Sequence, residues 1–387
     1  MPETFDLAVV GAGIVGLGHA LAAARRGLRV VVVDRDSATN GASIRNFGLV
    51  VVSGQTPGPS YRRARRSREV WLATAAEAKI DILHRGMVIA AQRPEALDAI
   101  EAFCATPEGA SCQVLTAAEL AEREPSLAGS SAIGGFFSPH ELRVESSLAL
   151  PRLVEWLQAH HGVSFRFGTA VRGVEPGRLL TSTGDVAASR IVVCPGDDLT
   201  TLFGDTIAEY RVRRCKLQML RLADPGFRLK SALMSDLSLL RYGAFATLPE
   251  TSALRRRLES ERASALANGV HLIVTQSADG SLVVGDSHHY GVTPDPFAST
   301  EVDALILAEY EALFRASPPR VTAHWVGTYA SSLKDEALRL PPCDGVRLVI
   351  VTSGTGASTG FALGEETVAE LFGDRKGERA RPGCEAP

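Results

Sequence analysis

Short apolar runs alternate with glycine-rich turns at the start of the chain. Phe5–Val10 is one such run and predicts a buried parallel strand, because strands covered on both faces are apolar almost throughout. The alanine-rich stretch Leu17–Arg26 predicts a helix that ends at Gly27. Leu28–Val33 predicts a second strand, and Asp34 follows it directly. The chain therefore begins with a strand–helix–strand unit.

Further along, the pattern becomes that of a mostly antiparallel sheet. Val270–Thr275 and Ser281–Val284 alternate between apolar and polar positions as half-buried strands do. Ala278–Ser281 supplies a glycine-containing turn, so these two strands are predicted to form a hairpin. Leu248–Asn268 is polar and rich in Arg and Glu, which predicts a surface helix in an insertion.

Gly11, Gly13 and Gly16 form a Gly-x-Gly-x-x-Gly motif between the first strand and the helix. Gly11 permits the tight turn, Gly13 lets a pyrophosphate approach the backbone, and Gly16 lets the helix pack on the strand. The helix N-terminus offers free N–H groups to the phosphates. Asp34 lies 18 residues after Gly16, where it can accept hydrogen bonds from ribose hydroxyls, and its charge argues against a 2′-phosphorylated cofactor. The motif in this context predicts a dinucleotide site.

The segment that follows Asp34 is small and polar. Within residues 40–50 (NGASIRNFGLV), Ser43 and Asn46 can hydrogen bond along an extended cofactor, and Gly48 lets a ring system approach the backbone. With this segment the chain resembles the D-amino-acid oxidase superfamily of FAD enzymes, which includes glycine and sarcosine oxidases. Three further stretches support the resemblance: Ile191–Asp198, Trp325–Tyr329 and Leu348–Phe361.

The resemblance implies the α/β (α+β two-domain) fold class. We expect a Rossmann-like FAD-binding domain of the glutathione-reductase/D-amino-acid-oxidase type and a mostly antiparallel β substrate domain. The FAD-binding domain is expected at residues 1–85, 141–212 and 325–374, the substrate-binding domain at 86–140 and 213–324, and a disordered tail at 375–387. The expected FAD contacts are Gly11, Gly13, Ile14, Val15, Gly16, Asp34, Arg35, Ser43, Arg45, Asn46, Phe47, Gly48, Val171, Cys194, Gly196, Gly327, Gly354, Thr355, Gly356, Ser358, Thr359 and Gly360.

The chain also departs from this superfamily at two places. Sarcosine oxidases commonly attach FAD through a cysteine after the Trp-x-Gly segment, but Ala330–Asp335 contains none, so we expect non-covalent FAD. The Arg-Pro that follows the glycine in many amino-acid oxidases is replaced by Thr328-Tyr329, so the usual carboxylate clamp does not transfer.

A narrower resemblance concerns the substrate. Six stretches are similar to FAD-dependent oxidoreductases associated with 2-aminoethylphosphonate catabolism: Arg45–Gly48, Gly54-Gln55, Arg65–Glu69, Val193–Gly196, Arg213–Met219 and Gly285–Gly291. This resemblance implies hydride transfer from an aminophosphonate, 2-aminoethylphosphonate or its N-methyl derivative, to flavin N5, and imine hydrolysis to phosphonoacetaldehyde and an amine. A phosphonate needs cationic donors, and the expected substrate contacts are Arg45, Gln55, Arg241, Tyr242, His288, Tyr290 and Tyr329. Tyr329, His288 and Lys216 are the candidate catalytic residues.

Two other functions stay open from the sequence. One is oxidation of glycine, sarcosine or a D-amino acid, against which the missing Arg-Pro counts. The other is a non-catalytic flavin-binding protein or a component of a larger complex. Individual residues also have ordinary alternatives: Arg45 could hold the FAD pyrophosphate, His288 could be a loop histidine, and Lys216 could be a solvated strand end.

Composition limits what else the protein can be. Its 387 residues suggest two domains, and Lys+Arg 41 against Asp+Glu 44 gives a net charge of −3, which argues against nucleic-acid binding. The basic stretch Tyr61–Arg68 is interpreted as a solvated helix face, with Ala64, Val70 and Trp71 turned away from it. Six scattered cysteines predict free thiols and no metal site.

No apolar run approaches the ~20 residues of a membrane span, and no secretory signal is found. We therefore expect a cytoplasmic monomer or homodimer, with a small-molecule amine substrate and dioxygen as electron acceptor.

Overall fold

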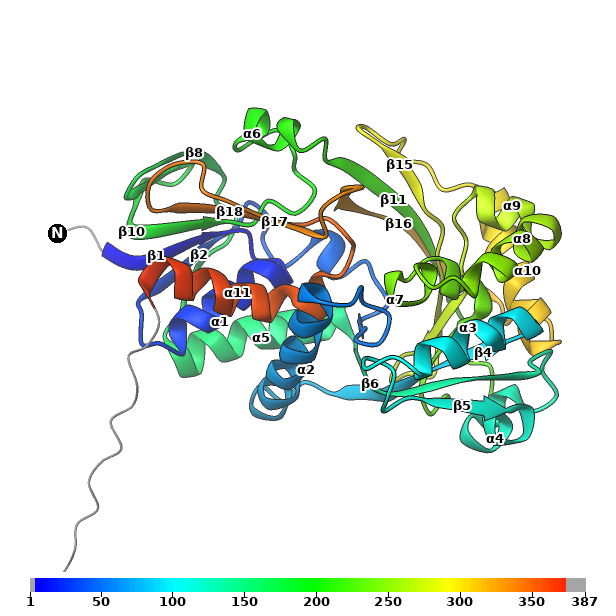
Figure 1. The fold of residues 1–387 in the computed structure, drawn as a ribbon. Coiled ribbons are helices and arrows are strands. Elements are labelled where there is room, and N and C mark those ends of the chain that lie inside the picture. Colours follow the sequence, from blue (N-terminus) through cyan, green and yellow to red (C-terminus); the bar gives the residue numbers. More distant parts are fainter. Residues whose placement is uncertain (1–3, 374–387) are drawn as a thin grey trace, which may run out of the picture.

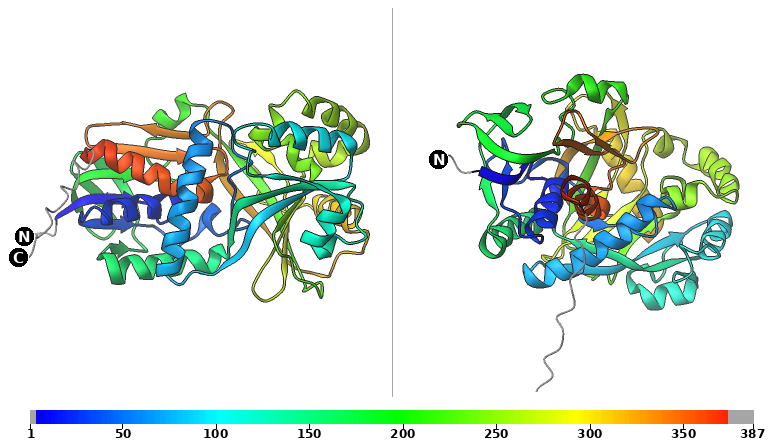
Figure 2. Two further views of the ribbon diagram at one scale, coloured as in Figure 1. Left: turned by 60° about the horizontal axis from the view of Figure 1, so that its bottom comes forward. Right: turned by 60° about the vertical axis from the view of Figure 1, so that its left-hand side comes forward.

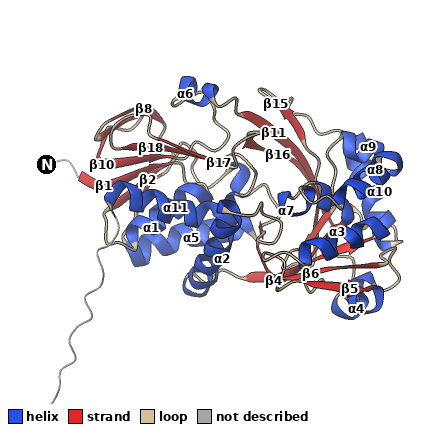
Figure 3. Ribbon diagram, in the orientation of Figure 1, coloured by secondary structure: helices blue, strands red, loops and turns tan. Residues whose placement is uncertain are grey.

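The computed structural model describes residues 4–373, which form two lobes, each built around one β-sheet (Figure 1). Two further views show the same division of the molecule (Figure 2). Helices and strands are mixed in both lobes (Figure 3). This architecture confirms the expected α/β fold class.

The first sheet is parallel at its centre. Its strands are β1 (Thr4–Val10), β2 (Val30–Val33), β7 (Ser164–Arg166), β8 (Val171–Glu175), β9 (Arg178–Thr181), β10 (Val186–Val193), β17 (Ala337–Leu340) and β18 (Val346–Val351). The order is β17-β18-β10-β1-β2-β7, with β9 beside β10 and β8 beside β9. Neighbours from β18 to β7 are parallel, whereas β17, β9 and β8 join antiparallel.

Three helices pack on one face of the first sheet, namely α1 (Ile14–Ala24), α5 (Ser146–His161) and α11 (Gly356–Phe372). Glycines bring α1 and α11 together, because a Cβ on Gly18 would lie 2.6 Å from the Gly360 carbonyl oxygen and one on Gly364 would lie 2.5 Å from the Gly18 carbonyl. The two helices begin after the carboxyl ends of β1 and β18. Their N-termini therefore open at one edge of a parallel sheet, where α/β proteins bind ligands. The opposite face packs on β8, β9 and α6 (Gly204–Glu209).

The second sheet is mostly antiparallel. Its strands are β3 (Leu49–Val50), β4 (Ile82–Ala91), β5 (Gln113–Thr116), β6 (Gly134–Val144), β11 (Arg213–Leu222), β12 (Ala232–Ser235), β13 (Ile273–Gln276), β14 (Leu282–Gly285), β15 (His289–Gly291) and β16 (Val321–Ser331). The order is β15-β11-β14-β13-β12-β4-β6-β3, with β16 also beside β11 and β5 beside β6. Within the described chain, β12 and β4 form the parallel pair of this sheet.

Helices cover both faces of the second sheet. One core lies under α3 (Pro94–Cys104), α7 (Gly243–Ala246) and α8 (Thr251–Glu261), and includes Phe103, Phe136 and Phe245. The other lies under α4 (Ala117–Arg123), α9 (Ala263–Ala267) and α10 (Thr300–Phe314). Three short 3-10 helices complete the elements: η1 (Gly41–Ser43), η2 (Pro125–Leu127) and η3 (Asp236–Leu240).

The helix α2 (Pro59–Glu77) carries the basic stretch and packs across α11 (Figure 2). Ala64, Val70 and Trp71 are buried, whereas Arg62, Arg65 and Arg66 are exposed, so the predicted solvated face is confirmed. Two exposed or half-buried ion pairs join the helices, Arg63 with Glu366 and Arg66 with Glu365. Arg63 and Arg66 therefore hold α2 against α11.

The predicted hairpin is present as the paired strands β13 and β14, and the predicted surface helix is divided into α8 and α9. Trp325–Ser331, expected with the FAD-binding domain, run in β16 instead, because this strand pairs with β11 almost from end to end and so belongs to the second sheet. The predicted tail at 375–387 lies outside the described residues. Between residues 4 and 373, no helix is long and apolar enough to span a bilayer.

Candidate cofactor and substrate site

One large cavity lies at the junction of the two lobes, with an empty volume of about 1370 Å³ that includes solvent at its mouth. The start of α1, the segment around η1, the carboxyl end of β18 and the start of α11 supply one part of its wall. The strands β11, β13 and β16 of the second sheet supply the other part. The cavity thus extends from the glycine loop to the second lobe.

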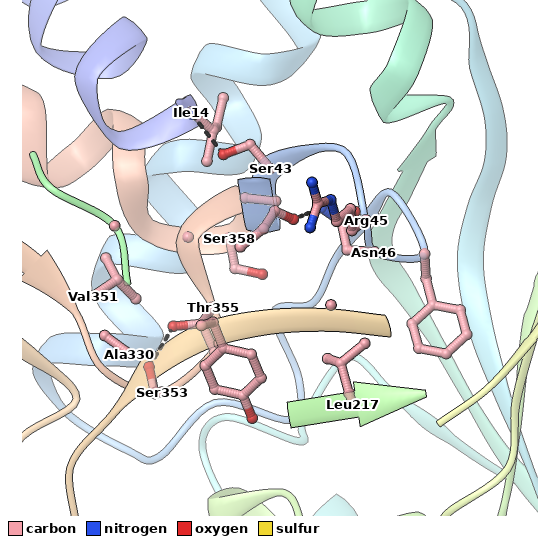
Figure 4. Close-up of a pocket in the computed structure, with 18 of the residues that line it drawn as sticks. Ile14, Ser43, Arg45, Asn46, Leu217, Ala330, Val351, Ser353, Thr355 and Ser358 are labelled. Carbon is pink, nitrogen blue, oxygen red and sulfur yellow. Dashed lines mark hydrogen bonds between the residues drawn. The ribbon is translucent and has the colours of Figure 1, made fainter. Parts of the chain in front are cut away.

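The glycine-loop end of the cavity holds the N-terminus of α1. Ser43 Oγ accepts a hydrogen bond of 3.0 Å from the Ile14 N–H, so the hydroxyl lies where an anion would cap the helix (Figure 4). A Cβ on Gly13 would lie 3.0 Å from this hydroxyl, and one on Gly16 would lie 1.9 Å from the Gly11 carbonyl oxygen. The glycines therefore permit the close approaches that the motif predicts.

Asp34 lies at the end of β2 and supports the glycine loop. Its Oδ2 accepts from the Ala12 N–H at 2.6 Å, and its Oδ1 accepts from the Asp36 N–H at 2.9 Å. A carboxylate has about four acceptor positions, so both oxygens keep capacity for ribose hydroxyls. The expected ribose contact stays a prediction.

A second helix N-terminus, that of α11, opens into the same cavity. Thr355 precedes this helix, and its hydroxyl lies 2.7 Å from that of Ser353 (Figure 4). Gly354 has φ of +74°, and a Cβ there would meet the Tyr329 ring at 3.0 Å. Ser358, in the first turn, accepts at its Oγ a hydrogen bond from the Val51 N–H. The loop is thus fixed from both lobes while its helix end faces the cavity.

These features fit an elongated dinucleotide cofactor such as the expected FAD. Two helix N-termini with free N–H groups face one cavity, and each helix dipole favours a negatively charged group there. Glycines at 13, 196, 327, 354 and 356 line the wall, and a Cβ on Gly196 would meet no atom within 4 Å. The cavity also reaches the second lobe, where a substrate could meet the reactive end of the cofactor.

Most of the predicted FAD contacts line this cavity. These are Gly13, Ile14, Val15, Gly16, Ser43, Arg45, Asn46, Phe47, Cys194, Gly196, Gly327, Gly354, Thr355, Gly356 and Ser358. The others do not line it: Gly11, Asp34, Arg35, Gly48, Val171, Thr359 and Gly360. Arg35 instead pairs with Asp198, and Gly48 has φ of +71° with its Cα against the Val144 carbonyl. Their contacts with FAD stay predictions.

Arg241 lines the part of the cavity that the second lobe forms. Its guanidinium donates to Tyr290 Oη at 3.0 Å and to Tyr329 Oη at 2.9 Å. Burial alone would lower the pKa of Arg241, but Tyr329, Tyr290 and Asp286 raise it, so the side chain stays charged. Burial raises the pKa of Tyr329 well above its usual value, so this phenol stays protonated. Within residues 4–373, the hydrogen-bond partners of this guanidinium are the two phenols.

Arg241 also lies at the boundary with a second cavity of about 640 Å³. Both cavities share Gln55, Arg241, Tyr242 and Tyr329, whereas Tyr290 lines only the second one. Tyr242 is half-buried and packs edge-on against His271. Gln55 donates to the Val51 carbonyl, and Arg45 donates to Asn40 Oδ1. Six of the seven predicted substrate contacts therefore line the first cavity.

Asp286 lies between two histidines in the same wall. His271 Nε2 is 3.1 Å from its Oδ1, and His288 Nε2 is 3.5 Å from its Oδ2. Burial alone would raise the pKa of Asp286, but His288, His271 and Arg241 outweigh it and lower that pKa. Burial lowers the pKa of His288 to about 3, and it also lowers the pKa of His271. At neutral pH the group is a carboxylate between two neutral rings.

The ligand atoms of these three side chains lie within 4.8 Å of one another, a spacing that a metal ion could bridge. Arg241 acts on the same carboxylate and lines the same cavity. Because its positive charge repels a second cation, the surroundings of the group oppose metal binding.

The assignment of Lys216 to the site is wrong. Side chains alternate along a strand, and Leu217 and Met219 of β11 line the cavity, so Lys216 and Gln218 point to the other side of the sheet. The Lys216 ammonium donates to Asp295 Oδ2 at 2.8 Å and to the Phe297 carbonyl at 3.1 Å. These contacts give Lys216 a structural role, in which it fastens the segment around Asp295 to β11.

Sequence reasoning missed Asp286 and His271. Asp286 stands within the stretch Gly285–Gly291, but its neighbour His288 drew attention because imidazoles are common acid–base groups. His271 is a polar residue in the apolar run Val270–Thr275, and such a residue in a buried strand was the available signal. Their convergence depends on the pairing of β13 with β14, which local pattern does not specify.

Comparison with known proteins identifies similar sequences and folds. The family DAO, described as FAD dependent oxidoreductase, matches residues 6–370. Glycine oxidase from Geobacillus kaustophilus is 27% identical over 206 residues, covering 50% of this chain and 54% of that protein. An opine oxidase component from Rhizobium meliloti is 29% identical over 209 residues, covering 49% of this chain and 56% of that protein. The chain therefore matches only about half the length of these relatives.

Solved structures match over nearly the whole length. The crystal structure of glycine oxidase from Bacillus cereus has a TM-score of 0.76 and 19% sequence identity, and the match covers 95% of both chains. At this identity the likeness concerns the fold alone.

Proposed function

We propose that this chain, which belongs to the DAO family of FAD-dependent oxidoreductases, oxidises the C–N bond of a small amino acid. Glycine, an N-substituted glycine such as sarcosine, and D-amino acids are the candidate substrates. Bound FAD supplies the chemistry of this reaction, as it accepts a hydride from the carbon that bears the nitrogen. Water then hydrolyses the resulting imine, and dioxygen is the proposed final acceptor.

The observation that carries this proposal is the half-buried guanidinium of Arg241. It donates to two phenols and has no hydrogen-bonded carboxylate among residues 4–373. A partly desolvated guanidinium that forms no ion pair with a carboxylate in the described chain is stabilised by an anion, and an anionic substrate group would supply that partner. Arginine binds carboxylates with two parallel hydrogen bonds, so Arg241 would hold and orient the substrate carboxylate. Tyr329 would donate its own hydroxyl proton to the same anion.

The usual arginine after the Trp-x-Gly segment is missing, and Arg241 reaches the cavity from a different element. It follows η3, and its guanidinium hydrogen bonds Tyr329, which directly follows Thr328, the residue at the place of the usual arginine. The absence of Arg-Pro therefore no longer argues against an amino acid substrate. The sequence similarity to the glycine oxidase of Geobacillus kaustophilus also supports this substrate class.

An aminophosphonate is the second candidate, as the sequence resemblance implies. One observation favours it: three donors, Arg241, Tyr290 and Tyr329, lie together, and a phosphonate offers three oxygens. Arg45, which lines the cavity, would supply a second cation for its second charge. The amine would then lie on the side of the cavity nearer the cofactor.

Anaerobic mixing of the purified yellow protein with single amines tests both candidates. We expect bleaching of the flavin absorbance by at least one of glycine, sarcosine and D-alanine. Bleaching by 2-aminoethylphosphonate or its N-methyl derivative alone would replace the first candidate by the second. An oxidised spectrum with every amine would contradict the proposal.

A further inference from the structure

Asp286 and His288 face each other with no hydrogen atom between their nearest polar atoms. His288 Nδ1 lies 2.9 Å from the Gly269 carbonyl oxygen, and a carbonyl can only accept. The neutral ring therefore carries its hydrogen on Nδ1, which leaves a lone pair on Nε2. Nε2 lies 3.5 Å from the carboxylate Oδ2. The Asp286–His288 pair can therefore accept one proton between Oδ2 and Nε2.

His271 and the packing around it hold the carboxylate from its other side. His271 Nδ1 lies 3.1 Å from Ser238 Oγ, and its ring stacks on His288 with centroids 5.1 Å apart. The exposed fraction is 4% for His271, 5% for Asp286 and 7% for His288. Asp286 Oδ1 is buried without an aligned hydrogen-bond donor in the described chain, although His271 Nε2 lies 3.1 Å from it. The carboxylate is therefore fixed in position with unused acceptor capacity.

We propose that the Asp286–His288 pair binds the ammonium group of the substrate and accepts one of its protons before oxidation. This inference rests on the proposed function, because it assigns the acid–base groups of that reaction. One N–H bond of the ammonium breaks, and its electron pair stays on nitrogen. The proton is then held between Asp286 Oδ2 and His288 Nε2. The product is the neutral amine, whose carbon can release a hydride to FAD.

The charges around the pair connect anion binding with proton transfer. The groups that act on Asp286 are His288, His271 and Arg241, together with Tyr242 and Cys215. Burial raises the pKa values of Tyr242 and Cys215, so both stay protonated and neutral. Arg241 lowers the proton affinity of both members of the pair. A substrate anion on Arg241 cancels this effect, so the pair becomes more basic when the ammonium arrives.

The charges of Arg241 and Asp286 together define the class of substrate that the cavity accepts. An anionic group binds Arg241, and an ammonium group binds Asp286, so the cavity selects small zwitterions. Neutral amines would lack the first contact, and N-acylated amino acids would lack the second. This deepens the proposed function without depending on the choice between carboxylate and phosphonate.

Rapid anaerobic mixing tests the proton transfer with the holoenzyme and whichever amine bleaches it. The rate constant for flavin reduction is measured from about pH 6 to about pH 10 for the wild type, Asp286→Asn and His288→Asn. The amide of Asn at 288 can still donate to the Gly269 carbonyl, so this variant removes chiefly the lone pair. Asp295→Asn and His289→Asn are matched controls, because Asp295 is exposed and neither residue lines the two cavities.

We expect both site variants to be slower than the wild type by about 100-fold or more at neutral pH. Their rate constants should rise about tenfold per pH unit toward alkaline pH, because the solvent then removes the ammonium proton. The controls should stay within about twofold of the wild type. If one site variant fails to fold, the other carries the test.

Three results would overturn the inference. A pH profile in the site variants equal to that of the wild type would show that the pair takes no proton. A uniform loss of rate without alkaline recovery would show a structural role only. One equivalent of metal in elemental analysis of the holoenzyme would show that a metal ion, and not a proton, lies between Asp286 and the histidines. Should no amine bleach the wild-type flavin, the proposed function fails and this inference fails with it.

Discussion

Tyr329 links Arg241 to the first lobe. Both residues belong to the second lobe, where Arg241 hydrogen bonds Tyr329 on β16, and the Tyr329 ring packs on Gly354 beside the start of α11. One guanidinium thereby connects the expected anion site to the loop at the expected flavin end of the cavity. Small changes at either phenol should alter how tightly an anion binds, with little effect on FAD.

Replacement of Tyr329 by Phe should weaken substrate binding. The variant keeps the ring that packs on Gly354 but loses the hydroxyl next to Arg241. We expect KM to rise about ten- to hundredfold, because hydrogen bonds to charged groups contribute about 1.5–3 kcal/mol, whereas kcat should change much less. Steady-state kinetics give both values, and Tyr210→Phe, at an exposed position away from the cavity, is the control. An unchanged KM would remove Tyr329 from the anion site.

The histidine of α1 should make stability depend on pH. Burial lowers the pKa of His19 from 6.5 to about 4. Between these pH values the unfolded chain binds a proton that the native protein does not, so the free energy of unfolding falls as pH falls through this window. The loss at pH 5 is about 2 kcal/mol relative to pH 7.5.

Urea unfolding of the wild type and His19→Met at pH 7.5 and pH 5 measures the contribution of His19 to the free energy of unfolding. Other buried histidines, such as His84, also contribute, so the comparison uses the difference between the two proteins. His19→Met should lose about 2 kcal/mol less than the wild type on going to pH 5. Equal losses in both proteins would show that His19 is not the group responsible.

At the scale of elements, the contact between α1 and α11 sets the position of both helix N-termini. Gly18, Gly360 and Gly364 let the two backbones touch, and the ion pairs of α2 with Glu365 and Glu366 hold α11 from its other side. Because both helices start at the cavity, a shift between them would displace the N–H groups expected to face the cofactor.

A methyl group at position 364 should disturb this contact. In Gly364→Ala the new Cβ would lie 2.5 Å from backbone atoms of Gly18, and neither backbone can yield without moving a helix. We expect a loss of about 1–3 kcal/mol in the free energy of unfolding, together with weaker FAD retention. Gly204→Ala is the matched control, since its Cβ would have only an ordinary contact at 3.6 Å. Equal thermal stability of the two variants would contradict this account of the packing.

At the scale of the whole molecule, the cavity belongs to neither lobe alone. The first lobe supplies the glycine loop and the start of α11, and the second supplies Arg241, Asp286 and the strand β16. The glycine loop, expected to bind the cofactor, and Arg241, expected to bind the substrate, thus line one cavity from different lobes.

FAD should be released intact when the whole molecule unfolds. Cys194 lines the cavity but is buried, and burial raises the pKa of its thiol, so a reactive thiolate is disfavoured. Ala330–Asp335 contains no cysteine at all. After acid precipitation, all of the yellow colour should stay in the supernatant with the mass of free FAD. Flavin fluorescence that migrates with the polypeptide on a denaturing gel would contradict this expectation.

Local sequence predicted the part of the site that depends on local geometry. The glycine loop follows from its turn and helix-start pattern, Ser43 from the small polar segment after Asp34, and the loop before α11 from the family resemblance. The structure brings all three together at one cavity. The error at Lys216 arose because strand phase, which decides the side that a residue faces, depends on pairing with β16. Asp286 and His271 were missed because two strands that are joined through a hairpin place them together only after folding.

The most direct test compares an amino acid with its own primary amide, in the wild type and in Arg241→Met. The amino acid that bleaches the flavin fastest is paired with its amide, which keeps the amine and the reacting C–H bond but lacks the anion. We predict that kcat/KM of the wild type favours the acid by about 100-fold or more, and that Arg241→Met loses most of this preference. An undiminished preference for the acid in Arg241→Met would contradict the central claim that this half-buried guanidinium binds the anionic group of the substrate.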